Sequence, residues 1–306
     1  MNMLGNKLIE WLFETNALRV SSADNPFWYT SGTIGPYYIN THFLYGNEEK
    51  ANKLLEFIDN KKDEIYNFPI ELTNVMWENY EKDAIYKGVI EQLCTFIKDT
   101  VGLDEIDYIS GGERRDWFFS FLTAKILGKP HLTIYKDLSI TEYNNNHVRK
   151  VKNIKDIDEN ENENNSIGDD NVTNIKGKKV LHITDLVTEA SSFERSWIPA
   201  VKNVGWNIKW SIAIVDRNQG GKELLQRLGV NLYSIVNIEE YTFEKALKLG
   251  LINDAQYKMI IDYINDPKGS MRKFLQENPE FLQKSLSMGG KIAERAKLCI
   301  EKKIYF

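Results

Sequence analysis

The stretch from Lys178 to Ser192, KKVLHITDLVTEASS, decides how the rest of the chain is interpreted. Its mostly apolar run, Val180 to Ile183, has strand length and leads to the acid Asp185, after which small and hydroxylated residues follow. Helical spacing begins at Phe193. This pattern predicts a buried strand that delivers a loop to a sheet edge, where open α/β sheets bind ligands and where an anion suits the start of the next helix. An ordinary buried strand and turn is the alternative.

The bulk composition fits a soluble globular protein. The chain has 306 residues, of which 42% are hydrophobic and 27% charged. Its net charge of −5 predicts no general attraction to nucleic acid, and no apolar run approaches the ~20 residues of a membrane span. The two cysteines, Cys94 and Cys299, predict neither a disulfide framework nor a metal cluster, so we expect a reduced, cytoplasmic protein.

The N-terminal part, residues 1–75, contains an aromatic segment from Pro26 to Tyr45, PFWYTSGTIGPYYINTHFLY. Its glycines and prolines predict a hairpin or two short strands around a turn. Core packing is the commoner reason for clustered aromatics, and a surface on which a flat ring stacks, supplied by Tyr37 and Tyr38, is the functional alternative. The segments that follow are predicted as a helix over Glu48–Tyr66, a strand over Pro69–Val75 and a helix over Trp77–Thr100.

The middle of the chain alternates strand and helix from about residue 105 to 237. This alternation predicts an α/β fold with a mostly parallel sheet flanked by helices. The predicted strands are Asp107–Ser110, Leu132–Tyr135, the apolar run from Val180 that ends at Asp185, Trp206–Val215 and Leu232–Asn237. Three loops follow the carboxyl ends of strands, at Gly111–Asp116, Asp185–Ser192 and Asp216–Gly221. We expect these loops to converge on one edge of the sheet.

Two regions differ in character from this pattern. Residues 137–176 are rich in Asn, Asp and Glu, which predicts a flexible acidic insertion, either a neutral one or a mobile lid. The chain is mostly helical and charged after Tyr241, which predicts a C-terminal helical extension over 241–306 beside a main domain over 1–240.

Three segments together resemble the type I phosphoribosyltransferases, and most closely the orotate phosphoribosyltransferases. SGTIGPYYIN (Ser31–Asn40) is similar to that family's N-terminal substrate segment, and VLHITDLVTEASS (Val180–Ser192) resembles its signature for phosphoribosyl pyrophosphate (PRPP). IVDRNQGG (Ile214–Gly221) resembles a turn whose arginine contacts the substrate carboxylate, and ISGGERRDW (Ile109–Trp117) lies where the pyrophosphate loop is expected. Their order and spacing fit over roughly residues 27–240.

The resemblance implies a fold and an activity. It implies a phosphoribosyltransferase-like sheet domain with an N-terminal hood segment. The implied enzyme transfers ribose 5-phosphate from PRPP to orotate or a similar carboxylated base, releases pyrophosphate and serves pyrimidine nucleotide biosynthesis. Mg²⁺ would be bound mainly through PRPP and pyrophosphate, without direct protein ligands. The expected partners are these small molecules and a second copy in a homodimer, with no nucleic acid and no membrane.

The resemblance also implies roles for individual residues. The expected catalytic residues are Asp185, beside the ribose hydroxyls, and Lys136. The expected PRPP-binding residues are Asp185, Thr188, Ser191, Ser192, Arg114 and Arg115. The expected base-binding residues are Ser31, Tyr37, Tyr38 and Arg217, where the arginine would pair with the base carboxylate. A surface turn is the alternative for Arg217, and ion pairs with Glu113 and Asp116 are the alternative for the two loop arginines.

The sequence departs from the family pattern at the signature itself. Thr184 stands where the family has the first of two acids, Ala190 and Ser191 stand where it usually has glycines, and Glu189 adds a negative charge beside the expected phosphate. These departures support an alternative hypothesis, a non-catalytic protein of this fold that binds a nucleotide or PRPP for regulation.

Overall fold

The computed structural model describes residues 3–154 and 177–306, which form two compact units. The first unit comprises Met1–Leu8 and Thr41–Ile238, and the second comprises Ile9–Asn40 and Glu239–Phe306. A helix, α1 (Met3–Glu14), contributes to both ranges. The division after Ile238 lies close to the predicted one at residue 240, but Ile9–Asn40 group with the C-terminal helices instead of with the sheet domain.

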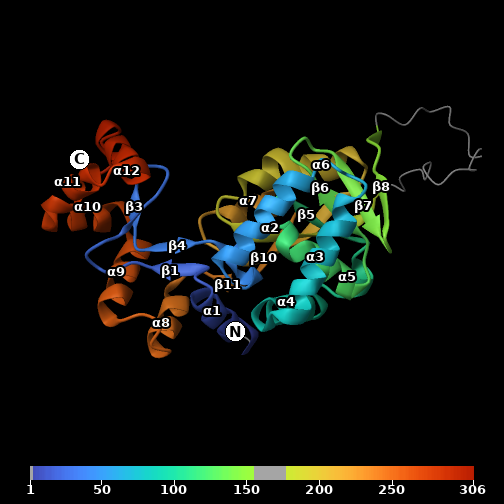
Figure 1. The fold of residues 1–306 in the computed structure, drawn as a ribbon, viewed down its shortest axis with the longest axis horizontal. Helices are drawn as coiled ribbons and strands as arrows, with labels where there is room; N and C mark the ends of the chain where they lie inside the picture. The colour runs from blue at the N-terminus through green and yellow to red at the C-terminus, as the bar shows by residue number, and fades with distance from the viewer. Residues whose placement is uncertain (1–2, 155–176) are drawn as a thin grey trace, which may run out of the picture. The chain divides into compact units, whose positions relative to one another are not determined.

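The first unit is built on a seven-stranded sheet in the order β11-β10-β9-β5-β6-β7-β8 (Figure 1). The pairs from β11 to β6 are parallel, and the pairs β6–β7 and β7–β8 are antiparallel. The strands are β5 (Tyr108–Gly112), β6 (His131–Ile134), β7 (Ile140–Asn144), β8 (His147–Lys150), β9 (Lys179–Val187), β10 (Asn207–Asp216) and β11 (Asn231–Asn237). The α/β fold with a mostly parallel sheet is therefore confirmed, and β9 is the predicted buried strand.

β9 is buried on both sides because helices cover both faces of this sheet. On one face, α6 (Ile198–Asn203) contributes to a hydrophobic cluster that includes Val180 of β9 and Ala213 of β10. On the other face, α5 (Trp117–Leu127) packs on β5, β6 and β9, and α3 (Phe68–Lys82) and α4 (Ala84–Thr100) pack on α5. The unit also contains α2 (Glu48–Lys61), α7 (Gly221–Arg227) and two short 3-10 helices, η1 (Thr41–Tyr45) and η2 (Leu103–Glu105).

Part of the predicted acidic insertion is ordered as a hairpin. The prediction of a flexible segment over 137–176 is wrong for β7 and β8, which extend the sheet beyond β6. The turn between them contains Asn145 and Asn146 with φ angles of 48° and 64°, and asparagine tolerates this left-handed conformation better than most residues. Residues 155–176, which include most of the acidic run, lie outside the described residues.

The predicted strand over Pro69–Val75 is also wrong, because these residues belong to α3. The pattern is helical once Phe68 and Met76 are included: the buried residues Phe68, Leu72 and Met76 are four apart and share one face. Pro69 lies near the helix start, where its missing N–H costs no helical hydrogen bond.

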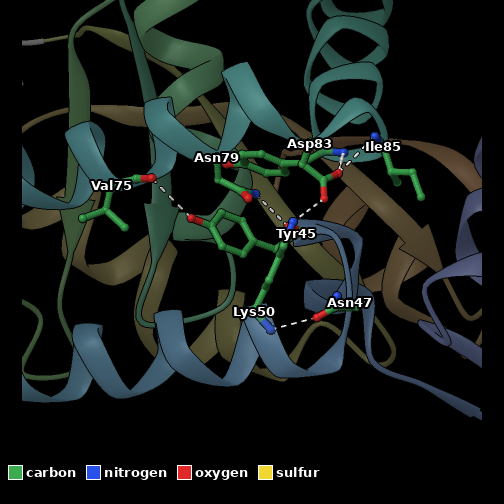
Figure 2. A network of polar contacts seen from close by, with 8 residues as sticks. Tyr45, Asn47, Lys50, Val75, Asn79, Asp83 and Ile85 are labelled. Atoms are coloured by element: carbon green, nitrogen blue, oxygen red, sulfur yellow. Dashed lines mark hydrogen bonds and ion pairs between the residues drawn. The ribbon is translucent and has the colours of Figure 1, made fainter.

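A polar network fixes how α2 and α4 begin, as Figure 2 shows. The Asn47 side chain caps α2 by accepting a hydrogen bond from the Lys50 N–H at 2.9 Å. The Asp83 side chain caps α4 by accepting from Ile85 N and Tyr86 N at 3.1 and 2.9 Å. The Lys50 ammonium lies 2.8 Å from the same carboxylate and so ties the two helix starts together.

The second unit consists of short strands and the C-terminal helices. Its strands are β1 (Leu18–Val20), β2 (Phe27–Trp28), β3 (Ile34–Gly35) and β4 (Tyr37–Ile39), paired as β1–β4 and β2–β3. Its helices are α8 (Glu240–Lys248), α9 (Asp254–Asn265), α10 (Pro267–Glu277), α11 (Pro279–Ser287) and α12 (Gly290–Glu301). Trp28 stacks on Phe281 and donates a hydrogen bond to Ser285, so the aromatic segment serves as core here. In the described part of the chain, every helix is too short or too polar to cross a membrane.

Candidate functional site

A cavity of about 360 Å³ lies in the first unit beyond the carboxyl ends of β5, β6 and β9. This is the edge at which the sequence places the candidate site. The lining includes Asp185 and the 188–192 loop after β9, the 113–116 loop after β5, and Lys136 after β6. The structure thus brings together the predicted residues Asp185, Thr188, Ser191, Ser192, Arg114, Arg115 and Lys136.

Asp116 joins the end of β5 to the end of β9. Its carboxylate is buried, and one oxygen accepts hydrogen bonds from the Thr184 hydroxyl and the Asp185 N–H, both at 2.9 Å. The other oxygen accepts from the Gly112 N–H at 3.1 Å and lies 3.4 Å from Nε2 of the buried His182. This carboxylate therefore fixes the relative position of the two loops.

Asp185 lies beside Asp116 with only 8% of its surface exposed. Its carboxylate accepts a hydrogen bond from the buried Thr41 hydroxyl at 3.0 Å. Burial, and then the negative charge of Asp116, raise the pKa of the Asp185 carboxyl to about 7, against smaller opposing effects of Arg115 and Thr41. The group thus changes charge near neutral pH when no ligand is bound.

The loop after β9 presents unused donors to the cavity. Within the described residues, the backbone N–H groups of residues 188–192 donate no hydrogen bond. Ala190 has a φ of 56°, a left-handed conformation that glycine adopts more easily. The Ser191 hydroxyl accepts a hydrogen bond from the Arg195 guanidinium at 3.1 Å. A run of free N–H groups with hydroxyls suits a phosphate, although the exposed Glu189 adds an opposing charge at the rim.

The loop after β5 is held against α2. Glu113 forms an ion pair with Lys62 at 2.6 Å and accepts a hydrogen bond from the Lys136 N–H at 3.0 Å, and the Lys136 ammonium lies at 4.0 Å. Arg114 is paired with Asp59 of α2 and not with Glu113 or Asp116, so neither sequence interpretation anticipated its partner.

Arg115 supplies a free cation at the cavity. Its side chain is exposed, and the guanidinium forms no hydrogen bond or ion pair with a described residue. His42, buried nearby on η1, has a pKa lowered to about 3 by burial and by the charges of Arg115 and Arg114. His42 is therefore neutral at physiological pH, and the positive charge on this side of the cavity comes from arginine.

Arg217 lies in the neighbouring loop but does not line the cavity. Its backbone N–H donates to Val187 O at 2.9 Å, and Gly221 N donates to Thr188 O at 3.1 Å, so the loops after β9 and β10 lie side by side as expected. The guanidinium Nε is buried without a hydrogen-bond partner among the described residues. Such a donor is costly to leave unpaired, which is consistent with a ligand oxygen as its partner.

The other residues expected at the base lie in the second unit, in the range Ile9–Asn40. Tyr37 is 3% exposed and packs on Phe243 and Tyr263, which is the core packing that the sequence left open as an alternative. Tyr38 is half-buried with its ring near Phe27 and Tyr29, and Ser31 is exposed and hydrogen-bonded to Thr33.

Sequence reasoning missed Thr41 and Lys62 as residues of this site, and it missed the role of Asp116. Each acts through a partner far away in the chain: Thr41 reaches Asp185, Lys62 reaches Glu113, and Asp116 reaches Thr184. The sequence offers one signal for Asp116, the acid at the end of GGERRD, which enters the sequence analysis only as an alternative partner for the loop arginines.

Comparisons with known proteins agree with this architecture. No family model matches the chain. It is 33% identical over 90 residues to an orotate phosphoribosyltransferase of Saccharolobus solfataricus, covering 29% of this chain and 45% of the relative. It is 33% identical over 96 residues to one from Staphylothermus marinus, covering 31% and 46%. The matches thus span less than half of the length of these relatives.

A solved structure, UMP synthase of Leishmania donovani, matches 85% of this chain and 42% of its own with a TM-score of 0.53 and 16% identity. This likeness concerns the fold alone. Together with the sequence matches, it shows that the chain has a type I phosphoribosyltransferase-like fold and resembles, as a divergent relative, the orotate phosphoribosyltransferases.

Proposed function

We propose that this protein is a phosphoribosyltransferase that transfers ribose 5-phosphate from PRPP to orotate or a similar carboxylated base. The observation that carries the proposal is the cavity beyond β5, β6 and β9. It combines the free N–H groups of residues 188–192, the unpaired Arg115 and the carboxylate of Asp185. A ligand with phosphate at one end, pyrophosphate at the other and hydroxyls between them would satisfy all three.

The proposed reaction asks the protein mainly for positioning. The bond between ribose C1 and the pyrophosphate oxygen breaks, and its electron pair leaves with pyrophosphate. A ring nitrogen of the base forms the new bond to C1 and releases its proton to solvent. Arg115 and Lys136 would stabilise the leaving charge, and Asp185 would hold the ribose hydroxyls while positive charge develops on the ring.

The residues fit a magnesium ion that arrives with its substrate. Within the described residues, no group of three or more His, Cys, Asp or Glu side chains is placed to hold a metal. Mg²⁺ prefers oxygen ligands and keeps several waters, so oxygens of PRPP and pyrophosphate would hold it beside Asp185. When bound, it would neutralise part of the pyrophosphate charge.

The decisive experiment measures pyrophosphate release by the purified protein from PRPP and Mg²⁺ with orotate, uracil, adenine, guanine or hypoxanthine. We expect release with orotate and at least a hundredfold loss in Asp185→Asn, because removing a group that acts in the transition state commonly costs this much. The absence of release with every base, or unchanged turnover in the variant, would overturn the proposal.

Arg217 gives a test of the base. We predict that Arg217→Ala raises the orotate KM by tenfold or more and leaves the PRPP KM within about twofold, because a bidentate pair with a carboxylate is lost. Arg217→Lys should recover only part of this effect, since an ammonium lacks the planar fork. Steady-state kinetics with each substrate varied in turn decides the question, and an unchanged orotate KM contradicts the role.

A second candidate function is binding without turnover. Glu189 on the cavity wall favours it, because a negative charge there opposes a phosphate. The protein would then be a regulatory PRPP or nucleotide sensor of the same fold. Calorimetry that finds tight binding of PRPP or a nucleotide, together with no pyrophosphate release, would favour this function over the first.

A further inference from the structure

We propose that Asp116 supplies the second carboxylate of the PRPP site, in place of the acid that is absent at Thr184. The inference rests on the proposed function and concerns how this chain meets its requirements with a different residue. Asp116 would act as a positioning residue. It would hold the Asp185 backbone and place a negative charge beside the ribose pocket. This charge would come from the loop after β5, the strand next to β9.

The first argument is where the Asp116 side chain points. Asp116 is the residue before α5, a place where aspartate commonly caps the helix with its own side chain. No such cap is formed. Both carboxylate oxygens face the ends of β5 and β9 instead, so the side chain gives up a favourable local role for a contact across the sheet.

The second argument is which atoms the carboxylate contacts. It accepts hydrogen bonds from the hydroxyl of Thr184 and from the N–H of Asp185, the two signature positions at the end of β9. The negative charge therefore lies 2.9 Å from the side chain of the residue that lacks one. The Thr184 hydroxyl thus donates a hydrogen bond to the carboxylate that we propose takes the place of an acid at position 184.

The third argument concerns crowding. Asp116 already acts on Asp185 as a like charge, and both groups line the same cavity. An acid at position 184 would add another negative charge within hydrogen-bond distance of Asp116, and like charges this close in a buried site repel strongly. We therefore expect a carboxylate to be tolerated at position 116 or at position 184, but not at both.

The test exchanges the two positions. Titration calorimetry with Mg-PRPP would compare the parent, Asp116→Asn, Thr184→Glu and the double variant, with thermal unfolding measured for each. We expect each single variant to bind about tenfold or more weakly, one through loss of the charge and the other through crowding. The double variant should recover to within about threefold of the parent, a coupling that additive effects cannot give.

A merely structural role for Asp116 gives a different result. The single variant would lose thermal stability, and Thr184→Glu would not restore PRPP affinity; additive losses in the double variant therefore overturn the inference. If Asp116→Asn folds poorly, Asp116→Gly with Thr184→Glu makes the same exchange without a misplaced amide. Asp137→Asn is the matched control, because Asp137 lies after β6, does not line the cavity and should leave PRPP affinity unchanged.

The outcomes also separate this inference from the proposed function. If the parent binds Mg-PRPP and the exchange fails to recover binding, only the role of Asp116 is wrong. If the parent does not bind Mg-PRPP at all, the proposed function fails and this inference fails with it.

Discussion

The pKa of the Asp185 carboxyl is well above that of an exposed aspartate. Its pKa is raised to about 7 by burial and by Asp116, whereas an unfolded chain has an aspartate pKa near 3.9. The folded protein therefore takes up a proton between about pH 4 and pH 7 relative to the unfolded chain. Above pH 7 the ionised carboxylate lowers the free energy of unfolding, and this penalty disappears as the pH falls toward 4.

We therefore predict that Asp185→Asn is more stable than the parent at pH 8, by up to ~4 kcal/mol, and that the gain vanishes near pH 4. The amide keeps an acceptor for Thr41 and removes the buried charge. Urea unfolding between pH 4 and 8 measures the difference. A stability difference that does not change with pH would contradict the raised pKa.

Asp137→Asn is a control for which we expect the opposite change in stability with pH. Hydrogen bonds from Ser139 lower the pKa of Asp137, so its ionised form stabilises the fold above the unfolded pKa and loses that effect as the pH falls. The control variant should therefore be less stable than the parent at pH 8 and similar to it under acid conditions.

At the scale of residues, the sequence predicted which side chains after β9 line the cavity but not the partners of these side chains. Asp185, Thr188 and Ser191 follow one another in a single motif, so one strand end places all of them. Thr41 and Asp116 are brought to Asp185 by other elements, and nothing near them in sequence indicates that contact. Arg217 lies in the loop next to the cavity and does not line it. The reason is that this loop follows β10, which is one strand further along the sheet than β9.

Among the elements, α4 has a start that is fixed by a single side chain, Asp83. Asp83 caps it with two backbone hydrogen bonds and also pairs with Lys50 of α2 (Figure 2). We predict that Asp83→Ala lowers the free energy of unfolding by ~1–2 kcal/mol, because two N–H groups lose their acceptor. Asp83→Asn keeps the cap and should lose less. Urea unfolding of both variants measures this, and equal losses would show that the ion pair, not the cap, matters.

The elements that sequence reasoning predicted well are those with a long, uniform pattern. β9, β10 and β11 are apolar runs bounded by turns, and the structure has each of them close to the predicted limits. The hairpin β7–β8 was missed because its residues are polar and its asparagine-rich turn resembles the acidic run that follows. In α3 the short apolar window Pro69–Val75 has the length of a strand, and the helical spacing appears only when Phe68 and Met76 on either side of it are included.

For the whole molecule, the division into two units also divides the expected roles. The first unit carries the residues proposed for PRPP and Arg217, and the second carries Ser31, Tyr37 and Tyr38. The sequence alone does not indicate this division, because the segment Ile9–Asn40 groups with helices that begin only at Glu240. The homodimer expected from the resemblance and the cytoplasmic location expected from the two cysteines stay predictions.

This division leads to a prediction about ligand protection. Mg-PRPP alone should slow amide hydrogen exchange in the first unit, at residues 185–192 and in β5, and should leave α9 to α12 of the second unit unchanged. A ligand that binds only the folded state stabilises it by ~2.7 kcal/mol at a hundred times its Kd, and the local part of this effect appears where the ligand binds.

Hydrogen exchange followed by mass spectrometry, with and without Mg-PRPP, measures the pattern. Pyrophosphate with Mg²⁺ is the matched comparison: it should protect the 113–116 loop, where Arg115 lies, more than residues 188–192, because it lacks the 5-phosphate. Protection by PRPP confined to α9–α12 would place the ligand in the second unit. In that case neither Asp185 nor Asp116 could have the role proposed here, since both belong to the first unit.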